Sequence, residues 1–206
     1  MEQNVSMKIN ELPSPTWNWL KVNETPIKWS NKIEPCEIAA EGDAVSTETE
    51  QLSDIETGAG READAIFATE NTAKYQILAD NAGQDKTVRL HISGKKDAHM
   101  AGCVEIVAKE NSTLTVVMDS RVAPDATKEE DSTAEASLAV RVRMKVESGA
   151  SVRLVQVQMP QEHETLLSDI GGNLIGEGAK VEYIQLFLGK GNLYSGCRMD
   201  LNGKES

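Results

Sequence analysis

The chain has 206 residues, of which 39% are hydrophobic, and it carries a formal net charge of -12 with an isoelectric point near 4.8. This acidity argues against a nucleic acid or an anionic membrane as the partner, because both require a basic surface. No apolar run approaches the roughly 20 residues that cross a bilayer, and charges at Glu2, Lys8 and Glu11 fall where a secretory signal needs an apolar centre.

The cysteines point to a reducing compartment. They are three in number, widely separated and without a CxxC pair: Cys36, Cys103 and Cys197. This pattern predicts neither a disulfide framework nor a zinc ribbon. We therefore expect a cytoplasmic protein.

The first predicted element is an arm over residues 1–33 with a small helical part. Ser14 can cap a short helix that has Pro15 at its first position. The arm contains every tryptophan of the chain, Trp17, Trp19 and Trp29. We interpret it as a segment that anchors its rings on the body of the same protein. The alternative is a docking peptide for a partner, because tryptophan is enriched at interface hot spots.

An acidic segment follows over residues 34–73. Between Glu34 and Asp64 there are ten acidic residues and one basic residue, Arg61. Such a composition offers little to a core. We predict a mostly solvated linker that is partly helical or disordered.

From residue 74 to residue 206, short β-branched runs alternate with polar turns, which predicts strands. The clearest strand is SLAVRVRMKV, residues 137–146, where apolar side chains alternate with Ala139, Arg141, Arg143 and Lys145. Alternation of apolar and polar residues along a strand indicates that one face is buried and the other is exposed to solvent. No acidic residue stands at a position that matches the three cations, so we expect them to form a solvated face.

Two stretches repeat at an offset of 29, the difference between Val181 and Val152: ESGASVRLVQVQM (147–159) and GEGAKVEYIQLFL (176–188). In both, the apolar phase slips by one residue before Val155 and Ile184, which predicts a bend or bulge. A fainter copy, ENSTLTVVM (110–118), aligns with the first of these stretches at an offset of 38. The terminal LNGKES aligns Gly203 with Gly178 at an offset of 25 and is interpreted as the opening turn of a further coil.

These repeats predict a mainly β fold, a parallel β-solenoid, over residues 74–206. An antiparallel sandwich also explains the alternation but not the repeated phase slip. Because the last copy stops at its turn, we expect the β-solenoid to be incomplete, cut at the start of a coil.

No catalytic constellation stands out. LGKGN (188–192) lacks the ending of a phosphate-binding P-loop, HETLL (163–167) lacks a second zinc-binding histidine, and GGNLIGEG (171–178) is interpreted as turns of the repeat. His99 and Cys103 are too few for a metal site. Cys197 is expected to be a small buried hydrophobe, with a thiolate ligand as the alternative.

The order of the segments resembles a known family. LPSPTWNWLKVNE near the start, together with SLAVRVRMKVESGASVRLVQVQ and GEGAKVEYIQLFLGKGNLYSGCRMDLNGKES, is similar to the SufB/SufD family of iron-sulfur cluster assembly proteins, and closest to SufD. The resemblance covers the arm and roughly residues 74–206. The acidic segment has no part in it.

The resemblance implies a right-handed parallel β-helix (solenoid) that follows an N-terminal region. It also implies a SufB-like paralogue and a SufC-like ABC-type ATPase as partners, with an iron-sulfur cluster present only in the assembled complex. The family's cluster-building and partner-docking regions would lie beyond Ser206. No functional residue is therefore transferred. The following residues receive no assigned role: Cys36, Cys103, Cys197, His91, His99 and His163.

The leading hypothesis is thus a SufD-like scaffold subunit for iron-sulfur cluster assembly that is not itself an enzyme. One alternative is a carbohydrate-active enzyme on a β-solenoid, which would need clustered charges on one outward strand face. The other is a non-catalytic β-helix interaction module without a role in iron-sulfur chemistry.

Overall fold

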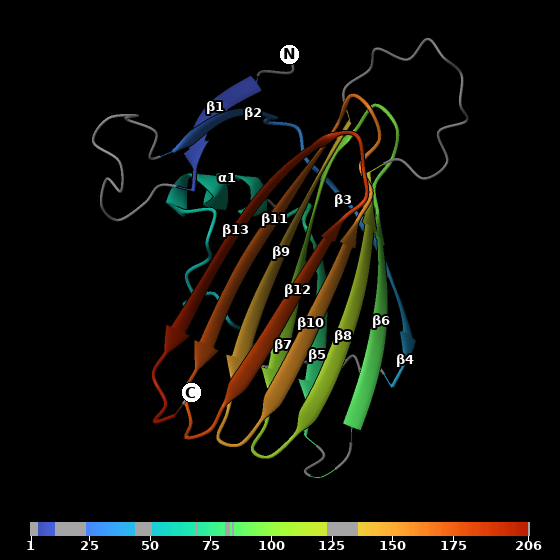
Figure 1. Ribbon diagram of the computed structural model, residues 1–206. Helices are drawn as coiled ribbons and strands as arrows, with labels where there is room; N and C mark the ends of the chain where they lie inside the picture. Colours follow the sequence, from blue (N-terminus) through green and yellow to red (C-terminus); the bar gives the residue numbers. More distant parts are fainter. Residues whose placement is uncertain are drawn as a thin grey trace.

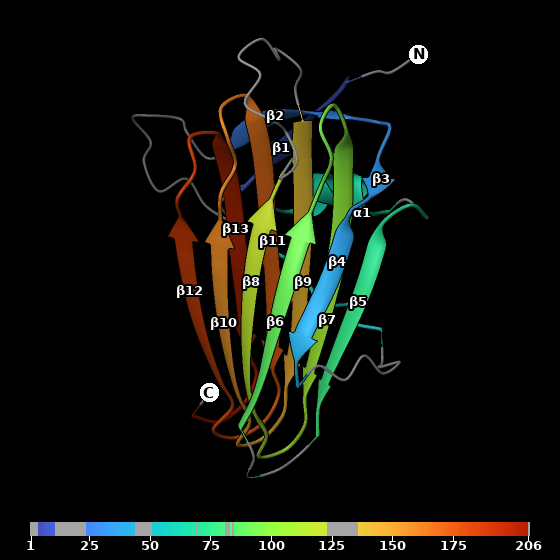
Figure 2. The same cartoon turned by 90° about the vertical axis from the view of Figure 1, so that its right-hand side faces the viewer.

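The computed structural model describes residues 4–10, 24–43, 51–68, 70–80, 83, 85–122 and 136–205. The fold is mainly β with parallel sheets, and α1 (Asp64–Phe67) is a short helix preceded by one 3-10 turn (Arg61–Ala63). Two long sheets face each other with their strand axes nearly aligned, and most strands of one sheet run opposite to the strands of the other (Figures 1 and 2). No helix among these residues is long and apolar enough to cross a membrane.

Successive strands from β6 onward alternate between the two long sheets. The even sheet contains β4 (Glu37–Gly42), β6 (Asp85–Ser93), β8 (Thr113–Arg121), β10 (Ser151–Gln158) and β12 (Lys180–Phe187). The odd sheet contains β3 (Glu34–Pro35), β5 (Ala73–Ala79), β7 (His99–Ala108), β9 (Ala136–Val146), β11 (Glu164–Leu174) and β13 (Asn192–Leu201). All their pairings are parallel except that of β4 with β6.

The strand register follows the predicted repeat. Val152 pairs with Val181 and Gln156 with Gln185, both at the offset of 29. Val152 also pairs with Leu114, at the offset of 38. Similar stretches of sequence therefore lie side by side as neighbouring parallel strands, and the antiparallel sandwich is excluded for these strands.

The predicted bulge is wrong, because β8, β10 and β12 pair without interruption along their common length. Gln156 and Gln158 continue the inward phase of Val152 and Leu154, so the apolar Val155 lies on the outer face. Inside, Gln156 accepts hydrogen bonds from Ser168 at 2.8 Å and Tyr183 at 3.0 Å, which satisfies its buried carbonyl oxygen. The phase slip in the sequence therefore marks a polar layer within the core.

The turns at one end of the sheets form a regular column. Asn111, Gly149, Gly178 and Glu205 have φ values of 58°, 65°, 68° and 59°. The backbone N–H of Asn111 bonds to Ser148, that of Gly149 to Glu177 and that of Gly178 to Lys204. The partner of Gly178 in the last turn is thus Glu205, and the predicted match to Gly203 was wrong by two positions. A left-handed turn tolerates non-glycine residues at modest cost, so the sequence alone misplaced it.

The described part of the arm forms an antiparallel pair, β1 (Asn4–Ile9) with β2 (Thr25–Ser30). Trp29 is 2% exposed and packs with Met7, Ile9 and Ile66. Anchoring on the body of the same protein is therefore confirmed for Trp29. The predicted helix at Ser14 and Pro15, together with Trp17 and Trp19, lies outside the described residues.

Residues 34–73 do not form a linker in their described part, although the predicted helical content is present in α1 and most of these residues are exposed. Residues 34–42 contribute β3 and β4 to the two sheets. Residues 51–67, here called the covering segment, bury a set of apolar side chains: Leu52, Ile55, Ala59, Ala63 and Ile66. These are spaced three or four residues apart, a pattern that the acidic composition concealed.

Candidate functional site

The candidate site lies on the outer face of the odd sheet, beneath the covering segment. Gly58 donates its N–H to the carbonyl of Ile170 at 3.0 Å, which brings the segment directly onto β11. A Cβ at Gly171 would lie 2.4 Å from the carbonyl oxygen of Glu56, and one at Gly196 would lie 2.4 Å from the backbone nitrogen of Ala59. Glycine at both positions therefore permits this close approach.

Gly171 and Gly172 lie within β11, so the prediction that GGNLIGEG forms only turns was wrong. Glycine often marks turns, but here it marks a strand that another backbone approaches. The prediction holds for Gly178, which occupies the column of left-handed turns.

A buried ion pair lies at the centre of the site. Asp169 has no exposed surface, and Arg141 is 3% exposed. The two are register partners on adjacent strands, and Arg141 Nε donates to Asp169 Oδ2 at 2.8 Å. Asp169 also accepts the Thr57 hydroxyl at 2.7 Å and the Ala59 N–H at 2.8 Å. One carboxylate thus holds the covering segment to the sheet.

Arg141 is enclosed on several sides. Its Nη1 forms an ion pair with Asp64 of α1 at 2.8 Å, and its guanidinium lies 4.1 Å from the centre of the Phe67 ring. Its Nη2 lies 2.7 Å from Asp169 Oδ2 but has no hydrogen-bond partner among the described residues. Arg141 thus forms ion pairs with both Asp64 and Asp169.

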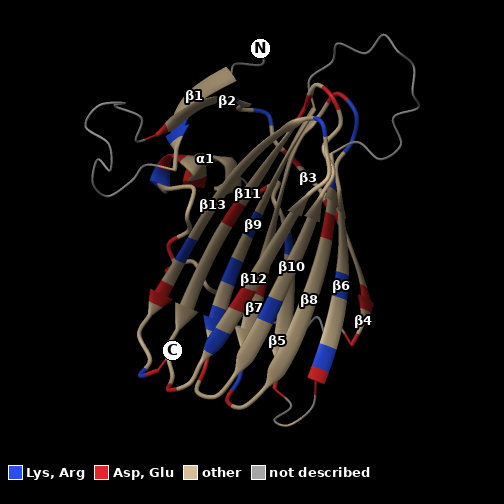
Figure 3. Cartoon of the chain, viewed as in Figure 1, with Lys and Arg blue, Asp and Glu red and all other residues tan. Residues whose placement is uncertain are grey.

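The expectation that Arg141, Arg143 and Lys145 form a solvated face was therefore wrong for Arg141, and Arg143 is only partly exposed. These residues belong to β9, and Figure 3 shows basic residues along this strand. The alternation placed them correctly on the outer face, but it contains no information about the covering segment. The missing acidic partner is Asp169, which lies 28 residues away in the chain.

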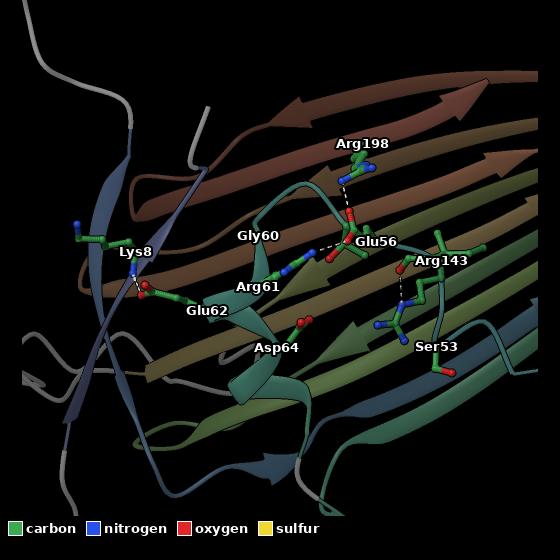
Figure 4. A pocket seen from close by; sticks show the side chains of 11 residues that line it. Lys8, Ser53, Glu56, Gly60, Arg61, Glu62, Asp64, Arg143 and Arg198 are labelled. Atoms are coloured by element: carbon green, nitrogen blue, oxygen red, sulfur yellow. Dashed lines mark hydrogen bonds and ion pairs between the residues drawn. The ribbon is translucent and has the colours of Figure 1, made fainter. Parts of the chain in front are cut away.

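Two cavities adjoin this ion pair, with volumes of about 510 and 290 Å³. Ser53, Asp64 and Arg143 line both. In the larger cavity (Figure 4), Glu56 pairs with Arg61 and Arg198, and Arg143 Nε donates to the carbonyl of Ile55 at 3.2 Å. Its cations are therefore mostly engaged with protein groups.

The smaller cavity contains the thiol of Cys103, which lies on β7 between Lys74 of β5 and Arg141 of β9 in the strand register. Burial raises the pKa of this thiol, while the nearby Arg141, Arg143 and Lys74 act to lower it. Its other lining residues are Gln51, Ser53, Asp64, Phe67, Ala68, Gln76 and Glu105.

The three cysteines occupy different environments. Cys36 is buried, and its pKa is raised to about 12. Desolvation by burial is the main cause, and the nearby Cys103 adds to it. Cys197 is exposed on β13, which differs from its expected burial, and its pKa is raised by partial burial and by Asp169. The described residues contain no group of three or more histidine, cysteine, aspartate or glutamate side chains that could hold a metal ion.

The histidines are likewise separated. His99 Nδ1 lies 2.7 Å from the Ser137 hydroxyl, and His91 Nδ1 lies 2.5 Å from Asp119 Oδ2 on the even sheet. His163 adopts a φ of 66° in the loop before β11. His99 and Cys103 lie four residues apart on one strand, which separates their Cα atoms by roughly 13 Å. The structure therefore does not bring this pair together as a metal site.

Sequence reasoning missed Asp169, Asp64 and Thr57. A single signal was present for Asp169, since an aspartate in the apolar run LLSDIGG needs a partner if the run is buried. No comparable signal exists for Asp64 and Thr57, which lie in the segment interpreted as a linker. Comparison of the chain with protein-family models, curated proteins and solved structures found no match.

Proposed function

We propose that this chain is a scaffold subunit for iron-sulfur cluster assembly, similar to SufD, built on a right-handed parallel β-solenoid. The carrying observation is the strand register, in which the two copies of the repeat become adjacent parallel strands. The repeated stretches are part of the sequence that resembles the SufB/SufD family. A β-solenoid would place such repeats side by side in this way.

The order of the strands supports a solenoid. From β6 onward, each strand is followed by one in the opposite sheet, and the next strand returns to pair in parallel with the first. One such circuit is a coil, and each coil covers the apolar face of its neighbour. The column of left-handed turns at Asn111, Gly149, Gly178 and Glu205 supports the same interpretation, since it repeats once per circuit.

The role in cluster assembly rests on the sequence resemblance. In this proposal the chain acts with a SufB-like paralogue and a SufC-like ABC-type ATPase, and the iron-sulfur cluster is cargo of the complex. Cys36 and Cys103 are both at least partly buried, so neither is offered as a residue that receives the cluster. The chain contributes a surface and a frame, and it carries out no reaction by itself.

The test is co-purification. The protein encoded by the complete gene is tagged and co-expressed with the SufB-like and SufC-like proteins of the same genome, and the complex is measured by size-exclusion chromatography. We expect a stable complex containing both partners. A folded chain that retains neither partner would overturn the proposal and favour an interaction module without a role in iron-sulfur chemistry.

One observation bears on the carbohydrate-active alternative. Arg141 and Asp169 supply oppositely charged side chains on one outward strand face, which the sequence had not indicated. However, Asp169 has no exposed surface and lies under the covering segment, so a polysaccharide has no access to its carboxylate. Cleavage of an acidic polysaccharide by the purified chain would reverse this preference.

A further inference from the structure

The smaller cavity has more hydrogen-bond donors than acceptors. Its floor comes from the adjacent strands β5, β7 and β9 of the odd sheet. Lys74, Cys103 and Arg141 are register partners across these strands, and Glu105 and Arg143 are partners two residues further along. Its wall comes from the covering segment and α1. At about 290 Å³, it is close to the lower limit of typical ligand pockets, roughly 300 Å³. A small ligand is therefore the appropriate class.

The carboxylates of this cavity are already occupied. Glu105 accepts from the Gln76 amide at 2.8 Å through Oε2 and from the Leu52 N–H at 3.3 Å through Oε1. Asp64 pairs with Arg141 Nη1 at 2.8 Å. These oxygens are thus engaged by protein donors.

Two of the three cations, in contrast, keep donors available. Arg141 lines the cavity, but Asp169 and Asp64 already hold its guanidinium, at 2.7 Å from Nη2 and 2.8 Å from Nη1. Arg143 uses Nε for the carbonyl of Ile55, and no described carboxylate pairs with its guanidinium. Lys74 likewise has no carboxylate partner among the residues that the structure describes. An oxyanion in the cavity would supply acceptors to both of these side chains.

Phe67 covers one face of the Arg141 guanidinium, whose edge is paired with Asp169 and Asp64. The guanidinium of Arg143 has no such carboxylate among the described residues. Guanidinium edges bind planar or tetrahedral oxyanions with charge-assisted hydrogen bonds.

We propose that this cavity is a binding site for a small oxyanion of the phosphate type, held by Lys74 and Arg143. The oxyanion is either free inorganic phosphate or the phosphate group of a small metabolite. The larger cavity shares Ser53, Asp64 and Arg143 with this one, and it gives space for the remainder of such a metabolite. The site is independent of the scaffold function proposed above.

The test uses Cys103 as a reporter within the cavity. The rate of its alkylation is measured by mass spectrometry in increasing sodium phosphate, with sodium chloride of equal ionic strength as the reference. Cys197, exposed on β13, is the internal control. We expect phosphate to slow alkylation of Cys103 but not of Cys197. Equal rates in phosphate and chloride would overturn the proposal.

Variants identify the residues that bind. Lys74→Gln and Arg143→Gln are each expected to weaken phosphate binding roughly tenfold or more in isothermal titration, because each removes a charge-assisted hydrogen bond. The matched control is Arg153→Gln, which removes an exposed cation on the even sheet. Arg143→Gln also removes the hydrogen bond to Ile55 and could disturb the local structure. Lys74→Gln breaks no ion pair with a described residue, so it tests phosphate binding independently. Equal affinities for Lys74→Gln and Arg153→Gln would contradict the assignment.

A second titration with glycerol 3-phosphate distinguishes the two sources of the oxyanion. Tighter binding than inorganic phosphate would indicate that the site recognises a phosphorylated metabolite through both cavities. Binding equal to or weaker than that of inorganic phosphate would indicate a site for the free ion. Both outcomes support an oxyanion site, whereas binding of neither compound overturns it.

Discussion

At the scale of single residues, the Arg141–Asp169 pair stands out because both charges are buried. Two charges removed from water carry a desolvation cost that only close pairing and additional hydrogen bonds offset. Asp169 receives these from Thr57 and Ala59, and Arg141 receives a second carboxylate from Asp64. The pair therefore adds specificity to the docking of the covering segment, and removing one partner leaves the other charge buried.

We predict that Asp169→Ala lowers the free energy of unfolding by about 3–5 kcal/mol, because Arg141 remains buried without its main counter-ion. The measurement is urea denaturation followed by circular dichroism. The control is Glu182→Ala, which breaks an exposed pair with Arg153 and should cost less than about 1 kcal/mol. Equal stability of the two variants would show that the buried pair has no special role.

At the scale of elements, the contact between the covering segment and β11 and β13 depends on glycine. The backbone of residues 56–59 lies so close to Gly171 and Gly196 that a methyl group at either position would meet backbone atoms. Gly172 lies on the opposite face of β11, where a Cβ would meet the Sδ of Met199 at 2.4 Å. A flexible methionine side chain can move, whereas two hydrogen-bonded backbones cannot separate without losing their contacts.

Gly196→Ala is accordingly expected to displace the covering segment, with a loss of about 1–3 kcal/mol in unfolding free energy. The direct measurement is amide hydrogen exchange at Gly58 and Ala59, whose N–H groups bond to Ile170 and Asp169. Exchange at both should become faster. Gly172→Ala is the matched control, since its neighbour is a movable side chain, and it should leave both amides protected. Unchanged protection in Gly196→Ala would contradict the proposed role of glycine.

At the scale of the whole molecule, the described residues contain two main apolar regions and a third, small cluster of Leu52, Ile55 and Val107. The larger one fills the space between the even and odd sheets. The smaller one joins the hairpin β1–β2, the covering segment and the outer face of the odd sheet, where Ala101, Ala139 and Leu167 are buried. The odd sheet thus has apolar contacts on both faces, which explains why near-continuous apolar runs appear in β7, β9 and β11.

Trp29 connects the parts of the smaller region, so Trp29→Ala should release them together. We expect a loss of about 3–5 kcal/mol, with faster hydrogen exchange in β1, β2 and residues 59–66, while β8 and β10 keep their protection. Val5→Ala provides the control on the same hairpin, because Val5 is 46% exposed. Uniform loss of protection across both regions in Trp29→Ala would show that they unfold as one unit.

Much of the strand arrangement was predictable because it depends on local periodicity. The repeat offset placed Val152 beside Val181, and the turns at Asn111, Gly149 and Gly178 were identified from the same alignment. The side chains that face inward were harder to predict. A run of apolar residues predicts burial, yet Val155 lies outside and Gln156 inside, because hydrogen bonds from Ser168 and Tyr183 satisfy the glutamine.

The candidate site could not be predicted in the same way. Arg141 and Asp169 lie on different strands, 28 residues apart in the chain. Thr57, Asp64 and Phe67 come from a segment whose acidic composition suggested a linker. Alternation shows which side chains share a strand face, but it cannot show whether another part of the chain covers that face.

Spacing along the chain was enough to establish the β-rich class, the repeat offset and the outer position of the basic residues on β9, since each depends on near neighbours in the sequence. The burial of Arg141, its pairing with Asp169 and the donor-rich cavity beside Cys103 became evident only in the folded chain. These features arise where residues 51–67 meet strands formed much later in the chain, and such long-range contacts leave no periodic pattern in the sequence.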